Sequence, residues 1–222
     1  MEYKPDQRRI KESQKNSEFK LNEQRKRALS GPTERFTVLK DWKKTREHIE
    51  TSTSIRIETL KKIKEQQEQL MLLKKDLENM IEKQKLKSLF TVEYSDMELT
   101  LSFGDALFFN TGSASIKQTG ESINIILANL FKRNNSDIFI EGHTDNIPIY
   151  NKKYPSNWEL SSARASAVVR SLIDKGIDPE RFAAIGFGEF QPIVSNDNEL
   201  NRSKNRRVKI ILKPKNILPE KK

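Results

Sequence analysis

Two opposite charges flank a polar loop in the C-terminal half of the chain. Asp145 follows the apolar stretch DIFIEG, which predicts a buried strand, and it stands two residues after His143 in GHTD. Arg164 stands in SNWELSSARASAVVRSL, which predicts a helix that opens with Ser156 and Glu159 in capping-box spacing. For an arbitrary aspartate and arginine, a structural ion pair is the best explanation. A site that binds a charged ligand is the alternative.

The other reactive residue types form no recognisable catalytic or metal site. His143 and Asp145 could bind a metal, but with 2 His and 0 Cys the chain offers no third histidine or cysteine to complete the site. The lack of cysteine also excludes disulfides, a cysteine nucleophile and a lipid-modified N-terminal cysteine. Ser161 and Ser162 lack the base and orienting group of a hydrolase triad. We therefore expect no cofactor, no metal and no enzymatic activity.

Charge divides the chain of 222 residues, which has 41 Lys and Arg, 31 Asp and Glu and a net charge of +10. Residues 1–90 carry 23 basic and 15 acidic residues, whereas residues 91–222 carry 18 and 16 and have a globular composition. The polar composition predicts a disordered basic tail over residues 1–32 and a short basic tail over residues 215–222.

The stretch from residue 33 to residue 90 predicts one long helix, because it lacks glycine and proline and is rich in Lys, Glu, Gln and Leu. Its apolar residues at near-heptad spacing are Ile63, Leu70, Leu73, Leu77 and Met80. This pattern is shorter than the three to four sustained heptads of a strong coiled coil. A homodimer through residues 49–84 and a single helix packed on its own domain therefore stay equal alternatives.

Strands and helices alternate after residue 91. VEYSDMELTLSF predicts strand, turn and strand, and KQTGESINIILANLFKRN predicts a helix with one apolar face. RFAAIGFGE and RRVKIILKP predict two further strands. We expect an α+β fold, an α/β sandwich with a mixed sheet and helices on one face, over residues 91–214.

Four separated motifs occur in one order: GHTDNIP, SNWELSSARA, IGFGEFQPI and NRSKNRRVKI. Together they resemble the OmpA C-terminal-like (OmpA/MotB) family of peptidoglycan-binding domains, and the helix motif is most similar to the MotB version. The resemblance covers roughly residues 99–214. It implies a βαβαββ-type fold that holds diaminopimelate, a residue of the peptidoglycan stem peptide whose side chain ends in an ammonium and a carboxylate.

The resemblance implies a role for eight residues. Asp145 matches the aspartate that meets the ammonium, and Arg164 matches the arginine that forks onto the carboxylate. Asn157 matches the asparagine that steadies the loop, and Leu160 shares its helix face. Backbone contacts are expected from Thr144, Asn146 and Ile147. Arg207 is a weaker match, as a second carboxylate contact.

The resemblance implies a non-enzymatic protein that binds the stem peptide and anchors a helical arm, or an envelope or flagellar-motor partner, to the cell wall. An intracellular scaffold or motor-associated interaction protein with a repurposed pocket is the alternative. Nucleic-acid binding through the basic N-terminal half is a remote alternative, because that half lacks interleaved aromatics and a known module.

The expected location depends on two conflicting signals. The family implies the periplasm or cell envelope. The N-terminal residues show no secretory signal, and no run approaches the roughly 18–20 apolar residues of a membrane helix. A chain that starts at Met1 and has no other export route would be cytoplasmic.

Overall fold

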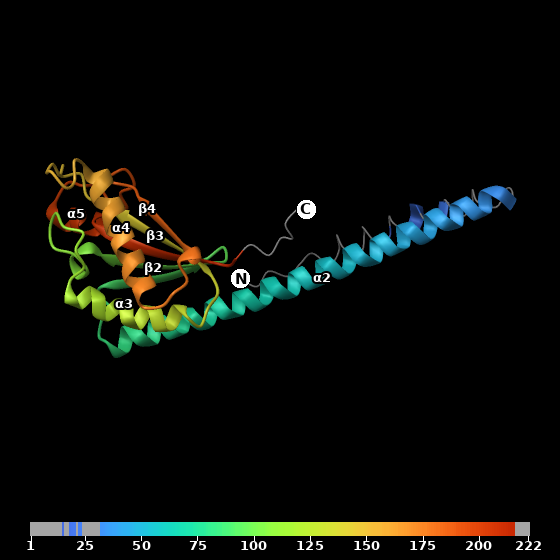
Figure 1. Ribbon diagram of the computed structural model, residues 1–222, viewed down its shortest axis with the longest axis horizontal. Coiled ribbons are helices and arrows are strands. Elements are labelled where there is room, and N and C mark those ends of the chain that lie inside the picture. Colours follow the sequence, from blue (N-terminus) through green and yellow to red (C-terminus); the bar gives the residue numbers. More distant parts are fainter. Residues whose placement is uncertain (1–14, 16–17, 21, 24–31, 216–222) are drawn as a thin grey trace. The chain divides into compact units, whose positions relative to one another are not determined.

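The computed structural model describes residue 15, residues 18–20, residues 22–23 and residues 32–215. The chain divides into two compact units, residues 1–59 and residues 60–222. The tails expected over residues 1–32 and 215–222 lie almost wholly outside the described residues. The candidate site belongs to the second unit, and Figure 1 labels most of the helices and strands of that unit.

Helix α2, Pro32–Lys83, is the long helix expected from the sequence. It ends in a Schellman motif, in which Lys85 adopts a positive φ of 58° and the Leu86 N–H donates to the Ile81 carbonyl. From residue 60 onward one face of α2 enters the domain core, and its buried residues there are Leu70, Leu73, Leu77, Met80 and Ile81.

This burial favours the second of the two alternatives for α2. Four of the five residues of the near-heptad pattern pack inside their own domain. Burial of these side chains stabilises the packing of α2 on its own domain, because each fully buried leucine contributes about 1.5–3 kcal/mol to the stability of the fold. A homodimer through residues 49–84 stays a prediction.

Five strands form one mixed sheet: β1 Phe90–Ser95, β2 Glu98–Gly104, β3 Asp137–His143, β4 Phe182–Gly186 and β5 Arg207–Lys213. Their order in the sheet is β1-β2-β5-β3-β4, with β3 and β4 parallel and every other pair antiparallel. The β1–β2 hairpin turns through Asp96 and Met97, both at positive φ, as a two-residue turn that follows the strand twist requires.

Helices α3 Gln118–Phe131 and α4 Asn157–Asp174 pack on the same sheet face as the end of α2. The core between these layers is one cluster, which includes Leu99 and Leu101 of β2, Ile138 and Ile140 of β3, Val208, Ile210 and Leu212 of β5, and Leu127 and Val168 of the helices. The strands and helices from β2 onward run βαβαββ, so the expected fold class is confirmed, with β1 and the short α5 Glu199–Asn205 as additions. Two single 3-10 turns, η1 Asp105–Leu107 and η2 Pro179–Arg181, complete the domain.

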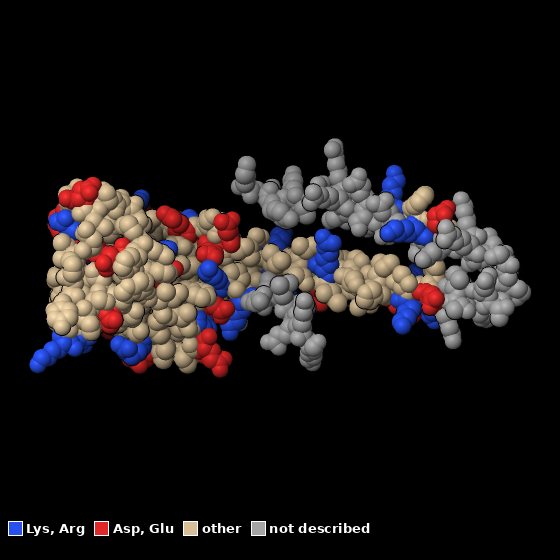
Figure 2. All heavy atoms as spheres, turned by 90° about the horizontal axis from the view of Figure 1, so that it is seen from above, with Lys and Arg blue, Asp and Glu red and all other residues tan. Residues whose placement is uncertain are grey.

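Basic and acidic side chains are interspersed on the face of the globular unit seen in Figure 2, and neither sign gathers into a broad patch there. Among the described residues, no helix combines the length and the apolar character that crossing a bilayer demands.

Candidate functional site

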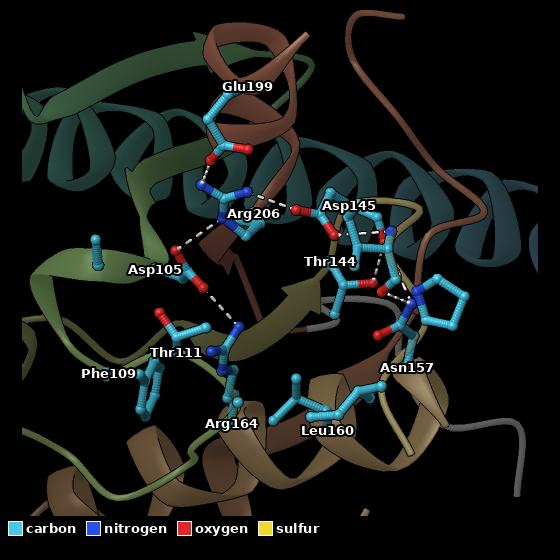
Figure 3. A pocket seen from close by; sticks show the side chains of 15 residues that line it. Asp105, Phe109, Thr111, Thr144, Asp145, Asn157, Leu160, Arg164, Glu199 and Arg206 are labelled. Atoms are coloured by element: carbon cyan, nitrogen blue, oxygen red, sulfur yellow. Dashed lines mark hydrogen bonds and ion pairs between the residues drawn. The ribbon is translucent and has the colours of Figure 1, made fainter. Parts of the chain in front are cut away.

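A cavity of about 400 Å³ lies at the ends of β2 and β3. Figure 3 shows its walls: Asp105 follows β2, Thr144 and Asp145 follow β3, three residues come from α4, and Glu199 and Arg206 come from α5 and the residue after it. The α4 residues are Asn157, Leu160 and Arg164. Five ionisable side chains therefore meet in one hollow, three carboxylates and two guanidinium groups.

Helix α4 is held close to the sheet, which places its side chains in the cavity. Ser156 is the N-cap that the sequence predicted, and its side chain accepts from the Trp158 N–H. Ser156 Oγ also donates to Glu159 Oε2 at 2.5 Å. A Cβ on Gly142 of β3 would lie only 2.2 Å from the Ser161 carbonyl oxygen. Glycine at this position thus permits the close approach of strand and helix.

Asp145 is buried, and the loop around it is braced by hydrogen bonds. Its Oδ1 accepts from the Ile147 N–H at 3.0 Å. Asn157 Nδ2 donates to the Asp145 carbonyl at 3.3 Å and to the Ile147 carbonyl at 3.0 Å, so Asn157 ties the loop to α4. The Thr144 N–H donates to the Gly188 carbonyl, so the N–H groups of Thr144 and Ile147 both have partners within the protein.

Arg164 is 2% exposed, and all three of its nitrogens donate hydrogen bonds. Nη1 lies 2.6 Å from Asp105 Oδ2, Nε donates to the Ser113 carbonyl at 2.9 Å, and Nη2 donates to the Asn110 carbonyl at 3.4 Å. Burial lowers the pKa of Arg164 and raises the pKa of Asp105, while the attraction between the two groups opposes both shifts. The pair also joins α4 to the segment after β2.

Arg206 is the second guanidinium of the cavity, and three carboxylates surround it. Nη1 lies 2.5 Å from Asp145 Oδ2, Nη2 lies 2.6 Å from Glu199 Oε1, and Nε lies 3.9 Å from Asp105 Oδ1. Burial works to lower the pKa of Arg206, but the hydrogen bonds to Asp145 and Glu199 outweigh it and raise that pKa. Asp145 and Arg164 therefore do not pair with each other, because each has its own counter-ion.

Six of the eight residues named from the sequence line this cavity, and two do not. Those that line it are Thr144, Asp145, Ile147, Asn157, Leu160 and Arg164. Asn146 is exposed and is not part of the lining. Arg207 lines a different hollow and donates to the Asn205 and Gln191 carbonyls.

Sequence reasoning missed Asp105, Glu199 and Arg206. The sequence held a signal for Arg206 in NRRV, where Arg206 and Arg207 are adjacent. Adjacent side chains in extended backbone point to opposite sides, so only one of these two arginines could face Asp145. Asp105 and Glu199 had no such signal, since their partners stand 59 and 7 residues away along the chain.

His143 is buried at the end of β3 and contacts its own domain. It is 1% exposed, its Nε2 lies 3.3 Å from Glu141 Oε2, and its ring stacks on Phe187 with centroids 5.1 Å apart. Among the described residues, no group of three or more His, Asp or Glu side chains could hold a metal ion.

Comparison with known proteins shows which family and which relatives this chain resembles. Residues 108–206 match the OmpA family. The chain is 36% identical over 151 residues to Motility protein B of Bacillus subtilis, and the match covers 67% of this chain and 58% of that protein. The chain thus spans less than two thirds of this relative.

Solved structures have the same fold. A putative MotB-like protein from Desulfovibrio vulgaris superposes with a TM-score of 0.62 at 25% identity, covering 70% of this chain and 98% of that one. The cell wall anchor of the type VI secretion system from Pseudomonas aeruginosa superposes with a TM-score of 0.58 at 28% identity, covering 61% and 95%.

Proposed function

The chain carries a domain of the OmpA family at residues 108–206, and from this premise we propose that it binds the stem peptide of peptidoglycan through the cavity that contains Asp145 and Arg164. The bound domain would anchor α2, or a partner held by the N-terminal unit, to the cell wall. The similarity to a cell wall anchor supports this role.

One observation carries the proposal: a single cavity presents a carboxylate and a guanidinium on separate walls, from the end of β3 and from α4. A diaminopimelate side chain ends in an ammonium and a carboxylate on one carbon. The ammonium would bind Asp145 Oδ2, and the carboxylate would bind the N–H groups of Arg164 that face the cavity. This function needs no reaction step, because binding alone attaches the chain to the wall.

The relatives also support a proposed setting. Motility protein B is among them, and solved periplasmic domains of Helicobacter pylori MotB share the fold at TM-scores up to 0.54. We propose a location in the cell envelope, with a motor-like or other envelope protein as the partner that the anchored chain would hold.

The test is a titration of a stem peptide that ends in diaminopimelate against the full chain. We expect Asp145→Ala to weaken binding by about 2–5 kcal/mol, because the ligand ammonium would be left buried without its partner. Isothermal calorimetry measures this loss, and pull-down on purified sacculi checks it on the polymer.

Asp197→Ala is the matched control, since Asp197 is exposed and lies outside the cavity. We expect it to bind like the wild type. Equal affinities for the wild type and Asp145→Ala would remove the site assignment and, with it, the main support for wall binding.

A further inference from the structure

Both charges that the stem peptide needs are already paired inside the protein. The Asp105 carboxylate lies 2.6 Å from Arg164 Nη1, and the Arg206 guanidinium lies 2.5 Å from Asp145 Oδ2. Neither contact is a loose surface pair, because Asp105, Asp145 and Arg164 are each less than 10% exposed. A ligand that takes over the charge of Asp145 or Arg164 must compete with these counter-ions.

Asp105 and Arg206 are also neighbours of each other. Arg206 Nε lies 3.9 Å from Asp105 Oδ1, and the Asp105 N–H donates to the Arg206 carbonyl at 2.9 Å. The two residues thus present one negative and one positive charge side by side, on two backbone segments that a hydrogen bond joins. Asp105 and Arg206 carry the same two charges as the proposed ligand, and they pair with Arg164 and Asp145, the two residues that the ligand would bind (Figure 3).

We propose that Asp105 and Arg206 form an internal stand-in for the ligand, and that the stem peptide binds by exchanging partners with them. This inference rests on the proposed function. The ligand ammonium takes Asp145 from Arg206, and the ligand carboxylate takes Arg164 from Asp105. The two released side chains then pair with each other, which needs side-chain rotation only, because the backbone hydrogen bond already holds them together.

Burial explains why the exchange selects for a ligand with both charges. A ligand with a carboxylate alone would displace Asp105 from Arg164 while Arg206 stays on Asp145. Asp105 is 7% exposed, so its charge would be left buried without a full partner. A ligand with both charges frees both stand-in residues at once, and every buried charge ends in a pair. Asp105 and Arg206 are therefore specificity-determining residues.

The test compares the wild type with the double variant Asp105→Asn with Arg206→Gln, which keeps the net charge and removes both stand-in charges. We expect the stem peptide to bind on the order of tenfold tighter or more, because nothing has to be displaced. The control is Asp174→Asn with Arg170→Gln, which makes the same charge change at two exposed positions of α4 outside the cavity lining. It should bind like the wild type.

Equal or weaker binding by the double variant, with an unchanged circular dichroism spectrum, would overturn the exchange and leave the proposed function standing. Binding by the variant alone would support the exchange, and binding by neither protein would overturn both ideas. If the variant does not fold, a crystal structure of the wild type with the stem peptide decides. The exchange requires the Asp105 carboxylate on Arg206 and the ligand carboxylate on Arg164, and an Asp105 carboxylate still on Arg164 would rule it out.

Discussion

The buried charges of the cavity each face a side chain of opposite charge. Arg164 and Asp105 are both almost fully buried, and they connect α4 with the segment after β2. Loss of one partner would leave an unpaired buried charge, which typically costs about 3–5 kcal/mol. An alanine substitution at Arg164 would therefore affect folding as well as binding, so Asp145, whose counter-ion Arg206 is partly exposed, is the cleaner position for the binding test.

His143 gives a pH dependence with a defined sign. Burial lowers the pKa of His143 below its ordinary value of 6.5, and the hydrogen bond that His143 donates to Glu141 only partly opposes this. Below pH 6.5 the unfolded chain takes up a proton at this residue and the folded chain does not. The contribution of neutral, buried His143 to the free energy of unfolding is therefore fully present above pH 6.5. It is lost as the pH falls toward the pKa of His143 in the folded chain, with a slope of at most about 1.4 kcal/mol per pH unit.

We expect the free energy of unfolding to fall between pH 7 and pH 5 in the wild type and to fall less in His143→Gln. Urea titrations at several pH values measure the difference. His48→Gln is the control, because His48 is exposed on α2 and should leave the slope unchanged. Burial works to raise the pKa of Glu141, but the hydrogen bonds from His143 and Lys209 outweigh it and lower that pKa, so Glu141 stays charged over this pH range. Parallel pH profiles for the wild type and His143→Gln would contradict the assignment.

Helix α2 combines two surfaces in one continuous element. Residues before Leu60 expose apolar side chains, including Ile49, Ile55 and Ile57, whereas Leu70 and Leu77 are buried in the domain. A leucine stripe with three- and four-residue spacing suits a partner helix and a sheet equally well. The sequence could therefore not distinguish a dimer seam from packing on the chain's own domain.

Leu77 and Leu72 provide a matched test of this packing. Leu77 is 0% exposed and Leu72 is 62% exposed on the same helix. We expect Leu77→Ala to cost about 2–5 kcal/mol of unfolding free energy, because it leaves a cavity in the core. Leu72→Ala should change it by less than about 0.5 kcal/mol. Chemical denaturation measures both values. If Leu77→Ala halved the mass in sedimentation and left stability unchanged, the face would be an interface between copies.

The folded domain draws on residues from both sides of the boundary expected at residue 91. That boundary stays a prediction, and the core offers a rival to it, because five residues between Leu70 and Ile81 are buried with the sheet. At about 1.5–3 kcal/mol each, their burial is comparable to the 5–15 kcal/mol total stability of a typical domain. We propose that the independently folding unit begins within α2.

Two truncated chains test this proposal. We expect residues 60–222 to unfold cooperatively in urea, as the full chain does. Residues 91–222 should unfold at much lower urea concentration, or bind a hydrophobic dye without a cooperative transition, because the sheet would expose the surface that α2 covers. Equal midpoints for the two chains would support the boundary at residue 91.

Local patterns in the sequence were enough to identify the order of the strands and helices apart from α5, and the cap of α4 at Ser156, while the motifs shared with a known family named six of the cavity residues. Each of these depends on residues close together in the chain: alternation along a strand, the spacing of a helix face, or a short motif such as GHTD. The pairing of the charges was different. Asp105 reaches Arg164 across 59 residues, and Arg206 reaches Asp145 across 61. Coulomb attraction depends on the distance between two charges in space. Only the folding of β2, β3 and α4 around one core sets those distances. The partners of Asp145 and Arg164 could therefore be found only in the folded chain.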